Sequence, residues 1–147
     1  MASNRKTSSY RRSSKKNKNL RLIILGEGDE ENNLKSLIDE HKLKEVTKIL
    51  PFQKNVYKYL KNSDVFVLSS IYEGFGNVVV EALYSGTEVV MTKCPGGALD
   101  IIKNGSLGTV VDNDNIESLA NGIAKVLNDE RLDRSSILKE RALEFNI

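Results

Sequence analysis

The sequence predicts an α/β fold in which a parallel sheet is covered by helices on both faces. Strand-like segments alternate along the chain with segments whose apolar residues recur at helical spacing. The strand-like segments, such as Leu22–Leu25 and Val65–Leu68, are continuous apolar runs, which are typical of strands buried on both faces. With 147 residues, the chain has room for one domain with its own core.

The first part of the chain predicts two strands and two helices. Gly26-Glu27-Gly28 ends the first apolar run, and Pro51 stops the second because proline cannot donate to a strand ladder. Between them, Leu34, Leu37 and Ile38 recur at helical spacing. The predicted elements are a strand at 22–25, a helix at 29–42, a strand at 46–50 and a short helix around 56–60.

The rest of the chain continues the alternation. Gly86 suits the position after a helix end, and Asp114 or Asn115 is expected to cap the clearest amphipathic helix. The last helix is highly charged. We expect it either to be exposed to solvent or to be a segment that returns toward a second lobe, which this chain lacks. The predicted elements are strands at 64–68, 88–92 and 108–111, and helices at 77–85, 98–103, 116–127 and 129–144.

Charge divides the chain into two parts. The first 21 residues hold eight of the 22 Lys and Arg residues and no acid, whereas the remaining 126 hold 14 basic and 20 acidic residues. Residues 1–19 are too polar to bury much surface, so we expect a disordered basic leader followed by one domain at 20–147. The leader could associate weakly with an anionic membrane surface. Nucleic acid is not an expected partner.

Several classes of protein are excluded. No apolar segment follows the N-terminal charges, as a signal peptide requires, and no stretch approaches the length of a membrane span. The single cysteine, Cys94, excludes an internal disulfide and fits a reducing cytosol. No His, Cys and Asp residues cluster at the spacing of metal ligands. We expect a cytoplasmic protein, at most peripheral at the inner face of the membrane.

The segment from Tyr72 to Ala82 is the most informative part of the sequence. Glu73 and Glu81 bracket a Gly-Phe-Gly turn and three valines, directly after a predicted strand. A strand, a glycine turn and a helix form a phosphate-binding corner, since the first helical N–H groups lack partners within the helix. Glu81 lies on an otherwise apolar helix, where a carboxylate requires a partner or a ligand. Alternatively, Glu81 caps neighbouring backbone and Glu73 is merely solvated.

Three glycine turns follow predicted strand ends: Gly26-Glu27-Gly28, Gly74-Phe75-Gly76 and Gly96-Gly97. In a parallel sheet the carboxyl ends of the strands share one rim, where ligands bind. We therefore expect the three turns to converge on a nucleotide or another phosphorylated ligand.

The ordered motifs resemble the C-terminal, donor-binding lobe of retaining glycosyltransferases of family 4, a Rossmann-like single lobe of the GT-B architecture. The resemblance covers about Asn19 to Asn128. Its landmarks, in family order, are L-I-I-L-G-E-G, V-T-K-I-L-P-F, Y-L-K-N-S-D-V-F-V-L-S-S, E-G-F-G-N-V-V-V-E-A-L-Y-S-G-T-E-V-V and C-P-G-G-A-L-D-I-I-K-N-G-S-L-G-T-V-V.

The resemblance implies a role for each motif. Glu73, the catalytic-site candidate, would accept hydrogen bonds from hydroxyls of the donor sugar, and Glu81 would hold the ribose hydroxyls. The remaining implied donor-binding residues are Gly74, Phe75, Gly76, Asn77, Val78 and Val79 around the sugar and diphosphate, Gly26, Gly28, Pro51 and Phe52 toward the nucleobase, and Gly96 and Gly97 beside them. The ligand is then a nucleotide-sugar, expected to be a UDP-sugar, with no further cofactor and no metal.

The chain departs from the family in three ways. Only the polar leader stands where the family carries a strand and helix with a diphosphate-gripping Arg and Lys. Asp100 replaces the glutamate of the family's G-G-x-x-E motif. No N-terminal acceptor lobe is present, so we expect glycosyl transfer, in glycan or polysaccharide biosynthesis, only with such a lobe from a partner chain or the parent protein.

Two alternatives stay open beside that reading. The chain could be a non-catalytic nucleotide-sugar-binding remnant or interaction module. It could also belong to a nucleotide-sugar epimerase, which also uses two such lobes.

Overall fold

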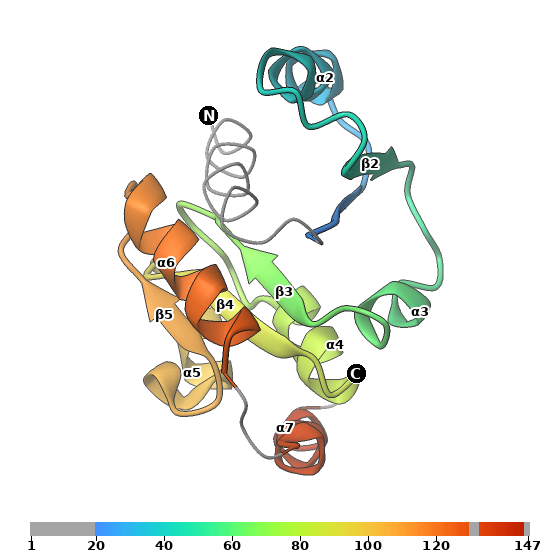
Figure 1. Ribbon diagram of the computed structural model, residues 1–147. Coiled ribbons are helices and arrows are strands. Elements are labelled where there is room, and N and C mark those ends of the chain that lie inside the picture. Colours follow the sequence, from blue (N-terminus) through green and yellow to red (C-terminus); the bar gives the residue numbers. More distant parts are fainter. Residues whose placement is uncertain (1–19, 130–132, 146–147) are drawn as a thin grey trace. The chain divides into compact units, whose positions relative to one another are not determined.

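The computed structural model describes residues 20–129 and 133–145, so the predicted leader lies outside the described residues. The chain divides after Asn55 into a first unit, residues 1–55, and a second unit, residues 56–147. Figure 1 shows the elements of both units. No helix in the described ranges is long and apolar enough to cross a membrane.

The first unit is a two-stranded parallel sheet with one helix. Strands β1 (Leu22–Leu25) and β2 (Thr47–Leu50) pair in register, and α2 (Glu31–Glu40) connects them. Ile38 of α2 and Leu43 form a small core with apolar residues of the sheet, among them Leu22 and Ile49.

The second unit contains a parallel sheet in the order β3-β4-β5. Every strand points the same way, so the segments that follow β3 and β4 leave from the same rim. Its elements are α3 (Tyr57–Leu60), β3 (Val65–Leu68), α4 (Asn77–Tyr84), β4 (Glu88–Thr92), α5 (Ala98–Ile101), the 3₁₀ turn η1 (Lys103–Gly105), β5 (Thr109–Val111), α6 (Ile116–Leu127) and α7 (Ser135–Ala142).

Helices cover both faces of this sheet (Figure 1). Successive strand residues point to opposite faces. Val90 therefore packs with Leu119 and Ile123 of α6, whereas its neighbours Val89 and Met91 pack in the larger core with α4, α5 and α7. The predicted α/β class, with parallel strands and helices on both faces, is confirmed.

Three details differ from the prediction. The strands form two parallel sheets rather than one, β1-β2 in the first unit and β3-β4-β5 in the second. The helices predicted at 29–42 and 98–103 end earlier than expected, at Glu40 and Ile101. Of the two candidate caps for α6, Asn115 fills the role, since its side chain accepts from the Ser118 N–H at 2.9 Å.

Candidate functional site

The segment that carries Glu73 is held by main-chain bonds to the turn after β4. The Glu73 N–H donates to the carbonyl of Pro95 at 3.2 Å, and the Gly97 N–H donates to the carbonyl of Gly74 at 2.7 Å. The buried Thr92 hydroxyl donates to the carbonyl of Ser70 at 2.6 Å. The Gly-Phe-Gly turn and the Gly-Gly turn therefore come together, as the sequence predicts for these two of the three turns.

Gly96 is where the two turns approach most closely. Its φ is +123°, and a Cβ built there would lie 1.5 Å from the carbonyl oxygen of Glu73. No side chain fits such a gap, and the backbone conformation itself favours glycine. Because Gly96 has no side chain, the backbone after β4 can pack directly against the backbone at Glu73.

The first N–H groups of helix α4 have no hydrogen-bond acceptor within the helix. Gly76, at φ +88°, precedes the helix, and a Cβ on it would lie 2.8 Å from the Ala98 Cβ, so α4 begins tightly against α5. Among the described residues, the N–H groups of Asn77 and Val78 donate no main-chain hydrogen bond. These two amides, with the positive end of the helix dipole, can receive an anion.

Val79 behaves differently from what the resemblance implies. Its N–H donates to the carbonyl of Gly76 at 2.8 Å, and its side chain is fully buried in the core. Val79 therefore closes the first turn of α4 and leaves ligand donation to the two residues before it.

Glu81 lies one helical turn further along α4 and is half-buried. Its neighbours Val80 and Ala82 are fully buried. Within the described ranges its carboxylate forms no hydrogen bond and no ion pair, and burial raises the pKa of that carboxyl. A carboxylate kept in this position without a partner is available to a ligand.

Glu73 is also half-buried, and within the described ranges its side chain forms no hydrogen bond or ion pair. Burial and the negative charge of Glu73 together raise the pKa of the Cys94 thiol, so the carboxylate faces the end of β4. Cys94 itself is 2% exposed and packs in the core. The thiol is a packing group, while Glu73 stays at the surface of the same corner.

The first unit brings its own predicted residues together at the carboxyl ends of β1 and β2. The Gly26 N–H donates to the carbonyl of Leu50 at 3.0 Å, and the Phe52 N–H donates to a carboxylate oxygen of Glu27 at 3.3 Å. Gly28 accepts from the Glu31 N–H at 3.1 Å and so starts α2. Phe52, directly after Pro51, is 73% exposed. That this corner converges with the other two turns stays a prediction.

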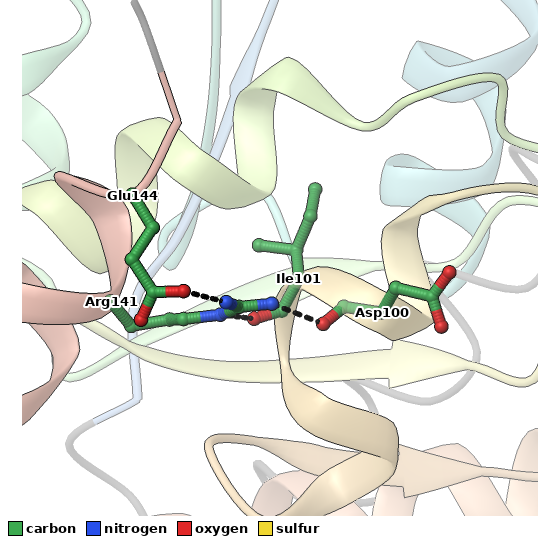
Figure 2. A network of polar contacts seen from close by, with 4 residues as sticks. All are labelled: Asp100, Ile101, Arg141 and Glu144. Atoms are coloured by element: carbon green, nitrogen blue, oxygen red, sulfur yellow. Dashed lines mark hydrogen bonds and ion pairs between the residues drawn. The ribbon is translucent and has the colours of Figure 1, made fainter.

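Two residues near the site were not predicted from the sequence, from which the last helix was expected to be a solvated face or a return segment toward a partner lobe. Arg141 donates from Nε to the carbonyl of Ile101 at 2.9 Å and from a terminal nitrogen to the carbonyl of Asp100 at 2.7 Å, and it also pairs with Glu144 (Figure 2). Phe145 packs edge-to-face on Phe75, with ring centroids 5.7 Å apart. Only the long-range fold brings these residues to the Gly-Phe-Gly turn.

Asp100 enters this network through its main chain. Figure 2 shows its carboxylate pointing away from Arg141 while its carbonyl faces the guanidinium. Replacement of the family's glutamate by aspartate therefore leaves the contact with α7 intact. Among the described residues, no group of three or more His, Cys, Asp or Glu could hold a metal ion.

Comparison with known proteins gives one family. The sequence family described as glycosyl transferases group 1 matches residues 7–144, a longer stretch than the resemblance noted above. The chain is 36% identical over 129 residues to the N-acetylgalactosamine-N,N'-diacetylbacillosaminyl-diphospho-undecaprenol 4-alpha-N-acetylgalactosaminyltransferase of Campylobacter jejuni, a match that covers 86% of this chain and 35% of the relative. It therefore spans about a third of the length of that relative.

Two solved structures resemble the chain closely. One is a TarM mutant of S. aureus, solved in complex with Fondaparinux, alpha-GlcNAc-glycerol and UDP. The two structures align with a TM-score of 0.88 at 25% identity, and the alignment includes 95% of this chain and 29% of the TarM chain. The other is HepE of Anabaena, solved in complex with UDP. It aligns with a TM-score of 0.71 at 25% identity, and the alignment includes 85% of this chain and 35% of the HepE chain.

A pair of glycine substitutions tests the contact between the turns. Gly96→Ala should lower the free energy of unfolding by about 3 kcal/mol, because the new methyl group collides with backbone and φ is strained. Gly74→Ala is the matched control, since a Cβ there meets nothing within 4 Å; we expect a change of about 0.5 kcal/mol at most. Urea unfolding measures both, and equal effects of the two variants would refute the geometry.

The raised pKa of Glu81 predicts how stability depends on pH. A carboxyl whose pKa is higher in the folded than in the unfolded chain favours folding when it is protonated, so its ionisation costs stability as pH rises above 4.5. Glu81→Gln should therefore melt at a higher temperature than the wild type at neutral pH, and the difference should vanish below pH 4.5. A Glu81→Gln difference in melting temperature that does not change with pH would contradict the assignment.

Proposed function

The chain belongs to the glycosyl transferases of group 1, and we propose that it binds a nucleotide-sugar as the donor lobe of a retaining enzyme. The TarM and HepE structures described above both contain UDP, which supports UDP as the nucleotide of the donor. We propose that transfer, in glycan or polysaccharide biosynthesis, takes place when an acceptor lobe completes the cleft.

The observation that carries the proposal is the exposed chemistry of α4. Its first two amides have no main-chain acceptor among the described residues, and Glu81 has no partner there. Amides at a helix start suit the diphosphate, and a carboxylate suits a pair of ribose hydroxyls, to which it can accept charge-assisted hydrogen bonds. A nucleoside diphosphate offers both groups at once.

Glu73 is proposed to act on the sugar. Its main chain is bonded to Pro95, and its carboxylate stands beside the end of β4. From there it would accept hydrogen bonds from sugar hydroxyls and orient the anomeric carbon. The bond from that carbon to the diphosphate breaks, a bond to the acceptor oxygen forms on the same face, and the proton of the acceptor hydroxyl passes to the departing diphosphate, whose charge the α4 amides stabilise. We propose that this helix end replaces a metal ion.

Calorimetry with the full chain tests the division of roles between the two glutamates. Glu81→Ala should weaken UDP binding roughly ten- to a hundredfold, since it removes charge-assisted hydrogen bonds worth about 1.5–3 kcal/mol. Glu73→Gln should leave UDP affinity within about threefold but remove most of the extra affinity that the sugar gives a UDP-sugar. Glu140→Ala removes a charge from an exposed helix position and should behave as the wild type.

The outcomes separate the competing functions. If the wild type binds UDP or GDP and Glu81→Ala binds it more weakly, the donor site is supported, and the nucleotide that binds identifies the preferred nucleobase. No heat with any nucleotide would refute it and leave an inert scaffold or an interaction module. A changed sugar in product analysis without an acceptor would refute transfer and support epimerisation.

A further inference from the structure

The end of α7 and the residues after it contact the Gly-Phe-Gly turn and the short helix α5, which follows the Gly-Gly turn. Arg141 binds the carbonyls of Asp100 and Ile101, which are the last residues of the short helix α5 (Figure 2). Helix α5 begins directly after Gly97, whose N–H is bonded to Gly74. One guanidinium thus holds the helix that carries the Gly-Gly turn.

The same guanidinium also supports the Gly-Phe-Gly turn through two aromatic rings. Its central carbon lies 4.7 Å from the centroid of the Phe145 ring, which meets the Phe75 ring at 70°. Stacked and edge-to-face contacts of this kind are directional, so they fix an orientation as well as burying surface. The column Arg141, Phe145 and Phe75 therefore runs from α7 to the centre of the turn.

We propose that Arg141 and Phe145 are positioning residues of the donor site, which set the Gly-Phe-Gly turn against the Gly-Gly turn. This inference rests on the proposed function for the ligand, but its structural part concerns the free protein. Leu138 and Ala142 are fully buried in the core and attach α7 to it. Beyond them, Arg141 bonds the end of α5, and Phe145 packs both on the edge of the core and on Phe75.

The side-chain chemistry explains why these residue types are required. Two carbonyls one residue apart face the planar guanidinium fork, which can donate to both at once, whereas a lysine presents a single point charge. The Arg141 side chain is only 15% exposed, so water has little access to its hydrogen bonds with the two carbonyls. Loss of the guanidinium would leave the carbonyls without a hydrogen-bond donor, which costs stability.

The test uses the full chain with Arg141→Lys and Phe145→Leu, both of which preserve charge or apolar volume so that the fold survives. Amide hydrogen exchange should rise about tenfold or more at residues 74 to 78 and at Gly97, and stay unchanged in α6, which packs on the other face of the sheet. UDP-sugar affinity should fall about fivefold or more in both variants. Leu143 lies on the turn between Arg141 and Phe145 and is 69% exposed. Leu143→Ala is therefore the matched control, and its amide exchange and UDP-sugar affinity should equal those of the wild type.

The two claims fail separately. If the wild type binds no nucleotide, the proposed function is refuted, and the exchange data alone decide whether the two residues position the turns. If both variants exchange and bind as the wild type does, or if exchange rises equally in α6, the positioning role is refuted. Faster exchange confined to the two turns, together with weaker binding, supports it.

Discussion

The contact between Gly96 and the carbonyl of Glu73 is the constraint on which the rest of the site depends. Two loops that leave neighbouring parallel strands can pack backbone against backbone only because one of them carries no side chain at the crossing. The contact sets the place of Glu73 and aligns the bond from Gly97 to Gly74. It also brings α5 close enough to α4 that Gly76 must be glycine as well. The Glu73 carboxylate and the start of α4 thus share one corner of the second unit.

The candidate site contains groups that find no partner in the part of the chain that the structure describes. Helix α4 is secured by its buried valines and Leu83, so it does not depend on its first two amides or on Glu81 for stability. Burial makes the ionised form of Glu81 costly, as the direction of its pKa shows. A bound ligand with paired hydroxyls and a phosphate would satisfy these groups together. This local conflict between stability and polarity is typical of binding sites.

The sequence was sufficient for the fold class and for one corner of the site. Continuous apolar runs identified the strands, and the position of the glycine turns after them identified two turns that do meet, at Gly74 and Gly97. Strand pairing was not predictable, because an apolar run carries no information about its neighbour, so the division into two sheets was not foreseen. Arg141 and Phe145 were missed since their partners lie 40 or more residues away along the chain, beyond any local periodicity.

We propose above all that the start of α4 receives the phosphate of a nucleotide. Amide chemical shifts during a titration of the full chain with UDP measure this directly. We expect the Asn77 and Val78 amides to shift strongly and to saturate together with those of Gly74 and Gly97, while the amides of α6 keep their chemical shifts. Saturable UDP binding that leaves Asn77 and Val78 unshifted would contradict it.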